Sequence, residues 1–466
     1  MLLFDSLLAM KFYDSGLLKK LLSKTSIAQN LAVEKNRMFQ QMLNLIRTLH
    51  INRSGRNDPY SRLEEGKVLV ELLLFEEAEE VVLKGLTHAQ DAEELLAELA
   101  LRELLRIIYK NTNKNDLLRH RIDNEYRMEM TSRKLTTLVR YTNINDRAFD
   151  YLRRYRVANM NEAKLGMDEL VNLPEAQDIN LATSLPAQQR FYNIWNFYHS
   201  SRNELSQALN ALLKVHNLWL ANPKRKTLHL TLYINHIGNI TGKLISLKRF
   251  SEAQGFLSTL EKLDVKGRRL LRMIFSTLEV QYQMYYMNSG DLQMALNREK
   301  NVTDGLRKFA GSIKDSVRLT LLYNLAVAHL VSGNSRLALQ YFNRIRELGE
   351  LRDRTDLQGA ARLLRLLLLE DMNDTVHFSH YLRNSGMFFT KKDRSYQLET
   401  AVYDWLHVQN KLVKKAERRA SFGQFADTIH SHIAKGFTGA EEMFIWASAK
   451  QRGIKPSTVF KEILAG

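Results

Sequence analysis

Four alanines recur at nearly even intervals through the middle of the chain, each a few residues after a polar turn sequence. They are Ala208, Ala253, Ala295 and Ala338, and the intervals between them are 45, 42 and 43 residues. Periods of roughly 20–50 residues are typical of chains built from stacked supersecondary units, each of which buries its apolar face against its neighbours. This recurrence constrains the possible fold more than any other feature of the sequence.

One such unit can be followed in the stretch NLAVAHLVSGNSRLALQYFNRI, residues 324–345. Apolar residues before the turn follow the i, i+3, i+4, i+7 spacing that places them on one helix face. Gly333 can end this first helix in the left-handed conformation, and Asn334 can cap a second helix. The second helix presents Ala338 where two helices approach closely, and Phe342 follows one turn later. The stretch therefore predicts a helical hairpin, which recurs at the other three alanines.

The whole chain is expected to be helical. Only five of the 466 residues are proline, and none lies between Lys224 and Lys455. Proline removes a backbone donor and clashes with the preceding turn, so its scarcity suits an almost continuous series of helices. Alternating runs of Val, Ile and Thr, which would indicate strands, do not occur. We predict an all-α fold.

The hairpin pattern resembles the tetratricopeptide repeat (TPR), whose signature combines a small residue in the second helix with a following aromatic residue. With Ala338 as the small residue, Gly333, Leu325 and Phe342 fall on the family's preferred positions, and His329 replaces its tyrosine. The period exceeds the roughly 34 residues of that family, so a HEAT-like array with a period of roughly 40–47 residues stays open. The resemblance implies a right-handed α-α superhelix, a TPR-like solenoid of helical hairpins with long, degenerate repeats.

Three regions are expected along the chain. Residues 1–180 are predicted to form an irregular helical region, with one TPR-like hairpin near residues 60–90. A stretch bracketed by two prolines separates it from the repeat array, residues 185–350. Residues 351–466 are predicted to form a further hairpin and a capping region, because terminal units cover the exposed edge of the core. This layout resembles that of uncharacterised bacterial TPR-like proteins, and the resemblance implies no known activity.

Helices are also predicted within the first region. Amphipathic spacing predicts one helix over residues 24–50. Acidic residues at its start and basic residues at its end favour a second helix over residues 91–110. A long polar helix is expected to follow and to end near Thr142.

The net charge of +17 is enough to attract nucleic acid, acidic proteins or anionic membrane surfaces. Acidic residues occur in most of the predicted helices, so most of this charge is expected on solvated helix surfaces. The chain has no cysteine, which excludes disulfides and thiolate-bound metals. It shows no secretory signal and no apolar run long enough to cross a membrane, and we expect a cytoplasmic protein. The basic groups are Lys19–Lys20, Arg153–Arg154–Arg156, Lys224–Arg225–Lys226, Arg268–Arg269, Lys391–Lys392 and Lys414–Lys415 with Arg418–Arg419.

The residues that could carry chemistry do not form a recognisable catalytic or metal site. Phosphate-binding glycine loops, the zinc-protease motif and the nucleophile-elbow motif are absent from the sequence. His377 and His380 could face one side of a helix, but a zinc site normally takes three or four protein ligands. The glutamate runs fall on faces predicted to be exposed, where nothing would tune their pKa for catalysis. We therefore expect neither enzymatic activity nor a cofactor or metal.

The resemblance to TPR arrays also indicates which side chains would line the concave surface. Phe197 beside Asn193 could anchor a peptide through an exposed aromatic ring. Asn239 and Asn324 share a position whose side chain often reaches the ligand backbone in that family. The basic residues with which some TPR domains clamp a carboxylate do not occur at the corresponding positions. The candidate partner-binding residues are Asn193, Phe197, Asn235, Asn239, Met284, Met287, Tyr323 and Asn324.

Two functions are compatible with these features. The first is a non-enzymatic protein–protein interaction scaffold or adaptor, which binds a protein or peptide segment in the concave groove of the helical-repeat array. The alternative is a nucleic-acid-binding protein that uses a basic face of the solenoid. The interspersed charge and the lack of a nucleic-acid recognition motif favour the scaffold. The identity of the partner and the oligomeric state do not follow from the sequence.

Overall fold

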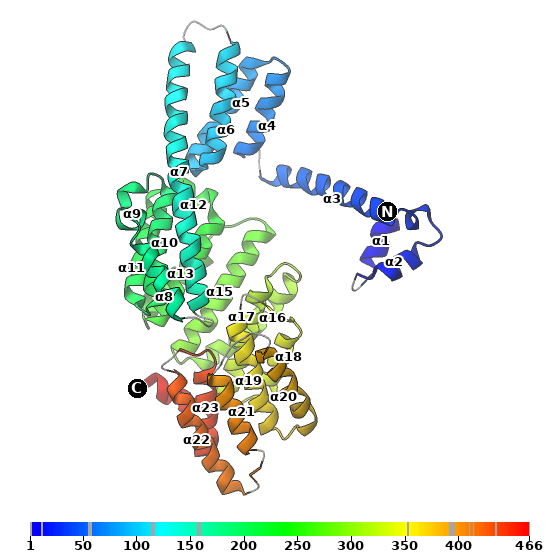
Figure 1. Ribbon diagram of the computed structural model, residues 1–466, viewed down its shortest axis with the longest axis vertical. Helices are drawn as coiled ribbons and strands as arrows, with labels where there is room; N and C mark the ends of the chain where they lie inside the picture. The colour runs from blue at the N-terminus through cyan, green and yellow to red at the C-terminus, as the bar shows by residue number, and fades with distance from the viewer. Residues whose placement is uncertain are drawn as a thin grey trace. The chain divides into compact units, whose positions relative to one another are not determined.

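The computed structural model describes residues 2–10, 13–54, 58–112, 117–155, 160–351, 354–390, 397–409, 411–412, 414–433 and 436–465 (Figure 1). Within these ranges the chain forms α-helices, two short 3-10 helices and turns, and it contains no strand. The prediction of an all-α fold is confirmed.

The chain divides into two compact units, Met1–Thr136 and Thr137–Gly466. The division falls inside helix α7 (Leu117–Tyr155). This helix was expected to end near Thr142, but no glycine or proline interrupts it and it continues for three further turns. The boundary predicted near residue 180 therefore lies inside the second unit.

The first unit contains two apolar clusters. Its helices are α1 (Leu2–Leu8), α2 (Ser15–Leu21), the 3-10 helix η1 (Ser26–Ala28), α3 (Leu31–Ser54), α4 (Pro59–Glu71), α5 (Phe75–Ala92), α6 (Leu95–Asn111) and the first part of α7. Leu3, Leu18 and Leu22 pack with the start of α3 in one cluster. The other cluster joins α4, α5 and α6 around Ala78 and Ile108, which are both fully buried.

Two predicted helix boundaries in the first unit are wrong. The helix expected over residues 24–50 begins only at Leu31, because a 3-10 turn precedes it. The helix expected over residues 91–110 begins at Leu95, because the preceding helix runs on to Ala92 and Glu93 ends it with a φ of 52°. Left-handed backbone of this kind commonly ends a helix, but it usually requires glycine or asparagine and was not foreseeable at a glutamate.

The second unit is a succession of helical hairpins. Its further helices are α8 (Met160–Val171), α9 (Pro174–Gln177), the 3-10 helix η2 (Ile179–Leu181), α10 (Leu185–Ser201), α11 (Leu205–Ala221), α12 (Pro223–Leu228), α13 (Leu230–Ser246), α14 (Phe250–Glu261), α15 (Arg268–Asn288), α16 (Leu292–Lys308), α17 (Asp315–Ser332), α18 (Ser335–Arg346), α19 (Thr355–Asp371), α20 (Thr375–Thr390), α21 (Gln397–Gln409), α22 (Lys415–Ile433), α23 (Ala440–Arg452) and α24 (Pro456–Ala465). From α13 onward, the first helix of each hairpin packs on the first helix of the next, through α15 and α17 to α19. In the preceding hairpin it is the second helix, α11, that packs on α13.

The evenly spaced alanines lie where the sequence predicts them. Ala208, Ala253, Ala295 and Ala338 each lie in the first turn of the second helix of a hairpin, and none is more than 1% exposed. Ala78 has the same place in hairpin α4–α5 and is fully buried. A side chain no larger than a methyl group lets the two helices approach closely at this point. The recurrence of hairpins around these alanines is confirmed, and the right-handed superhelix stays a prediction.

A common turn joins the two helices of these hairpins. Between α17 and α18, the N–H of Asn334 donates to the carbonyl of His329 at 2.8 Å, and the N–H of Gly333 donates to that of Leu330 at 3.0 Å. These two bonds satisfy carbonyls that the helix end would otherwise leave unpaired. The central residue has positive φ and lies five positions before the buried residue of the second helix. The residues at this position are Leu73, Asn203, Lys248, Gly290, Gly333 and Asn373.

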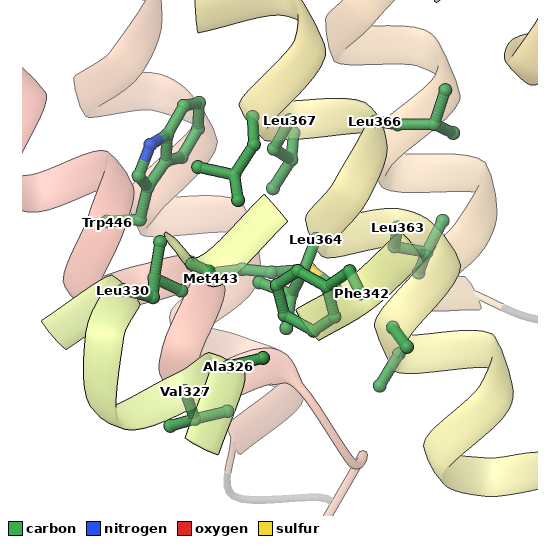
Figure 2. Packing of buried hydrophobic residues seen from close by; sticks show 14 of the residues in the cluster. Ala326, Val327, Leu330, Phe342, Leu363, Leu364, Leu366, Leu367, Met443 and Trp446 are labelled. Atoms are coloured by element: carbon green, nitrogen blue, oxygen red, sulfur yellow. The ribbon is translucent and has the colours of Figure 1, made fainter. Parts of the chain in front are cut away.

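The largest apolar cluster extends from the α17–α18 hairpin to the C-terminal helices (Figure 2). Most of α17 is buried on all sides, as is α19, because α18, α20 and α23 pack around them. Figure 2 shows Met443 of α23 between Leu330 of α17 and Leu364 of α19, and Trp446 of α23 near Leu367 of α19. The C-terminal helices thus pack onto the last hairpins of the array and complete its core.

Candidate functional site

The eight predicted partner-binding residues occupy four successive hairpins. Asn193 and Phe197 lie on α10, and Asn235 and Asn239 lie on α13. The remaining four form a group: Met284 and Met287 of α15 and Tyr323 and Asn324 of α17 line one cavity of about 190 Å³. The structure therefore brings together the half of the set that lies nearest the C-terminal helices.

The cavity has walls from two parts of the sequence. One wall consists of α15 and α17, and Val327 and Val331 continue its apolar surface along α17. The opposite wall consists of α23 and α24, with Ile445, Phe460 and Leu464 among its lining residues. The methionine side chains are flexible and can adapt to differently shaped apolar groups. We call the surface that α15 and α17 present to this cavity the α15/α17 face.

A chain of amide groups forms the polar part of the cavity. Gln283 is 2% exposed and its Nε2 donates to the carbonyl of Leu321 at 3.3 Å. Asn324 Nδ2 donates in turn to Gln283 Oε1 at 3.2 Å. This network holds the side chain of Asn324 at the cavity, where its own carbonyl oxygen is oriented by the bond to Gln283. An amide in this position can exchange hydrogen bonds with a peptide backbone.

A carboxyl group lies opposite the tyrosine of the set. The Tyr323 hydroxyl donates to Glu442 Oε1 at 3.2 Å. Burial, together with a smaller contribution from the neighbouring charge of Glu441, raises the pKa of the Glu442 carboxyl to about 7. Burial also raises the pKa of Tyr323 well above its usual value, and Glu442 adds to this shift. At neutral pH Tyr323 is therefore a hydrogen-bond donor, whereas Glu442 is divided between its charged and neutral forms.

The four other predicted residues do not share a site. Phe197 is half-buried, and its ring lies 5.7 Å from that of Phe149 on α7, so α7 covers part of the surface expected to be open. Asn193 beside it is half-buried as well. Asn235 and Asn239 are exposed on α13.

A second, more open hollow of about 400 Å³ lies between α9, α10 and α11. Tyr192 and Trp195 line it together with Lys214. Trp195 Nε1 donates to the carbonyl of Ala176 at 3.0 Å, and the ammonium of Lys214 lies 5.4 Å from the centre of the Tyr192 ring. The indole N–H of Trp195 and the ammonium of Lys214 thus already have partners within the protein.

The histidines singled out in the sequence take part in local packing. His329 is 5% exposed, and its Nε2 lies 3.1 Å from Glu299 Oε2, as expected for a hydrogen-bonded core residue. His377 bonds to Asp374 at 2.9 Å, and His380 bonds to Asn384 at 3.2 Å, so the two imidazoles have separate partners. Among the described residues, no group of three or more His, Asp or Glu side chains could hold a metal ion.

Several of the basic groups are used inside the fold. Arg225 is 5% exposed and stacks on Trp219, with 4.7 Å between the guanidinium carbon and the ring centre. Arg418 forms an ion pair with Glu370, and Arg419 donates to backbone carbonyls of α23. The side chains of Arg154, Arg156, Lys391 and Lys392 lie outside the described residues. Three arginines of these basic groups, Arg225, Arg418 and Arg419, therefore have partners within the fold.

No protein-family model matches the chain, and no curated protein matches it. Within the described residues, no helix has both the length and the apolar character needed to cross a membrane.

Two contributors to the cavity were missed in the sequence. Gln283 precedes Met284 directly, but the repeat register does not assign it to the concave surface. Glu442 lies 119 residues after Tyr323, and no local pattern links the two. The acidic start of α23 was the only available signal, and helices commonly begin with acidic residues for reasons of helix stability.

Proposed function

We propose that the second unit is a non-enzymatic scaffold that binds a segment of a protein partner on the α15/α17 face. The observation that carries this proposal is the convergence of Met284, Met287, Tyr323 and Asn324 on one cavity. These four residues were selected by the TPR-like register alone, and they come from two different hairpins. Apolar walls with a few oriented polar groups are typical of peptide-binding surfaces.

The chemistry of the cavity supports a peptide rather than a small reacting substrate. Its ionisable groups are the Tyr323 hydroxyl and the two glutamates of α23. Tyr323 and Glu442 bond to each other, and no described basic side chain lines the cavity. Hydrogen bonding and apolar contact are the interactions that this surface offers.

A site-specific cross-linking experiment tests the proposal. A photo-reactive amino acid replaces Asn288, which is exposed and lines the cavity, in the full-length protein expressed in its own host. The matched control replaces Asn297, which is exposed on α16 and does not line the cavity. After nuclease treatment, we expect protein cross-links at position 288 and not at position 297. Equal cross-linking at both positions, or none at 288, would contradict the proposal.

The same experiment separates the alternative function. Cross-links to nucleic acid that disappear on nuclease treatment would indicate that the positive charge is the working surface. In that case binding would also weaken steeply as the salt concentration rises.

A further inference from the structure

Helix α24 lies on the α15/α17 face, which the repeat pattern assigns to a partner. It is ten residues long and follows α23 after a turn at Gly453, whose φ is 69°. Val459 and Phe460 are 3% and 5% exposed, and Leu464 is half-buried one turn later. The opposite side of the helix, with Lys461 and Glu462, is exposed. α24 is thus an amphipathic helix whose apolar side packs on α17.

The surface on which α24 packs extends from one hairpin turn to another. Leu464 Cδ1 lies 3.1 Å from the place that a Cβ atom would take at Gly290, in the turn between α15 and α16. Pro456 Cδ lies 3.8 Å from the corresponding place at Gly333, in the turn between α17 and α18. The equivalent turns elsewhere carry leucine, asparagine or lysine at this position. Glycine therefore occurs at the two turns that the ends of α24 approach, where a larger side chain would meet the helix.

The fit of α24 on this face is incomplete. The cavity of about 190 Å³ remains between the helix and α15 and α17, and Phe460 and Leu464 form part of its lining. Side chains beside an unfilled space lose the contacts that close packing would provide. The ion pair between Arg452 and Glu462, which links α23 to α24, is exposed and contributes little to holding the helix. Ordering ten residues also opposes the gain from burying so few side chains.

We propose that the α15/α17 face binds an amphipathic helix of a partner protein, and that α24 is the intramolecular occupant that this helix displaces. The inference rests on the scaffold function proposed above and names the class of partner. By the pattern of α24, the partner helix carries a pair of bulky apolar residues followed by a second apolar pair one turn later. A partner side chain that fills the cavity beside Met287 would give the partner an advantage over α24.

A binding experiment with a peptide of the chain's own sequence tests the displacement. The probe is a fluorescein-labelled peptide of residues 455–465, measured by anisotropy against the full-length protein. Phe460→Asp places a charge in the buried contact and should release α24, so we expect this variant to bind the probe at least tenfold more tightly than the wild type. Leu464→Asp is a milder second variant at the end of the helix and should act in the same direction.

Two controls make the result specific. Phe149→Asp changes an exposed phenylalanine of α7 and should bind the probe as weakly as the wild type. A scrambled peptide should bind none of the proteins. Far-UV circular dichroism of each variant establishes that its helices are retained, and the rate of tryptic cleavage after Lys461 reports whether α24 has been released.

Three outcomes would overturn the inference. The first is a variant with α24 released, as judged by proteolysis, that binds the probe no better than the wild type. The second is a concentration-dependent dimer of the wild type that exchanges α24, because the occupant would then be a second copy. The third is cross-linking at position 288 that does not increase when α24 is released. The scaffold itself would fail separately, through the absence of protein cross-links at position 288 in every variant.

Discussion

Hairpins α13–α14 and α17–α18 place an asparagine at the same position and give it different surroundings. Asn239 and Asn324 each lie 14 residues before the buried alanine of their hairpin. Asn239 is exposed, whereas Asn324 is half-buried beside the cavity and donates to Gln283. The difference arises because α23 and α24 pack on α17. The position of a residue within the repeat thus determines to which side of the hairpin its side chain points. The neighbouring helices determine whether that side chain is exposed or covered.

The two hairpins also share their backbone turn but not its central residue. Lys248 and Gly333 have φ values of 56° and 86°. The paired turn bonds are equivalent, at 2.9 Å each around Lys248 and at 2.8 and 3.0 Å around Gly333. The left-handed backbone conformation is unfavourable for a residue with a Cβ atom. The turn at Lys248 therefore carries more backbone strain than the turn of the same geometry at Gly333. Comparison of the two hairpins separates what the repeat requires from what its surroundings add.

The largest effect is expected where the hairpins are alike. Ala338→Trp and Ala253→Trp should each lower the free energy of unfolding by about 3 kcal/mol, because both alanines are fully buried between two helices. Urea denaturation measures this directly. Ala310→Trp, at an exposed position, should change stability by less than about 0.5 kcal/mol. An unchanged midpoint for Ala338→Trp alone would show that the two hairpins do not share a repeat.

The next largest effect is expected in the pH dependence of stability, where the two hairpins should contribute in opposite directions. On α13, burial lowers the pKa of His236 to about 3. As the pH falls, this histidine is therefore protonated in the unfolded chain before it is protonated in the folded protein. The free energy of unfolding should then decrease by about 2 kcal/mol between pH 6.5 and pH 5. Against α17, burial raises the pKa of Glu442 to about 7. The folded state then retains the proton longer, and stability falls as pH rises from about 4.5 to 7.

The two contributions can be separated by substitution. Denaturation of His236→Phe should show a weaker loss of stability in acid, and that of Glu442→Gln should show a weaker loss between pH 4.5 and 7. The slope against pH is the quantity of interest, because either substitution can also shift stability at every pH. Identical slopes in the wild type and Glu442→Gln would contradict the burial of that carboxyl group.

A smaller effect is expected at the two asparagines. Asn324→Ala removes the donor to Gln283 Oε1, a buried acceptor, and should destabilise the protein by about 1 kcal/mol. Asn239→Ala affects an exposed side chain and should change stability by less than about 0.5 kcal/mol. Equal decreases in stability for Asn324→Ala and Asn239→Ala would show that the packing of α23 and α24 on α17 does not give Asn324 a different environment from Asn239.

The smallest effect is expected at the turns. Lys248→Gly relieves left-handed strain and should stabilise the protein by about 0.5 kcal/mol, after allowance for the greater freedom of glycine in the unfolded chain. Gly333→Ala should destabilise it by a similar amount through the reverse effect, because the added Cβ atom would make only an ordinary contact with Pro456, at 3.8 Å. Thermal unfolding of the two single variants and the double variant measures both changes. A loss of stability with Lys248→Gly would mean that the lysine side chain makes a contact worth more than the strain.

Much of the fold could be predicted because its signals are local. The alanine spacing and the helix-face periodicity located the hairpins from α10 to α18, and Gly333 marked the turn between α17 and α18. Leu73, Glu93 and Lys248 marked turns that could not be predicted, because their residue types do not favour positive φ. Here the packing of the two helices imposes the conformation against local preference.

The candidate site divides in the same way. Met284, Met287, Tyr323 and Asn324 followed from the register, since a position within a repeat is a local property. Glu442 and Phe460 did not, because they reach the α15/α17 face through tertiary packing over more than a hundred residues. Phe197 was expected to be exposed because the register indicates only the side of the hairpin on which it lies. Its contact with Phe149 on α7 is non-local and could not be predicted in this way.

Native-state hydrogen exchange of the full-length protein tests the central claim most directly, since it compares the stability of α24 with that of the α15/α17 face beneath it. If α24 is a displaceable occupant, its amides open locally and should exchange at least about a hundredfold faster than those of α17. Exchange of α17 should then require unfolding of the large apolar cluster. Exchange of α24 and α17 together, at the rate of global unfolding, would show that α24 is a permanent part of the core and would contradict the account.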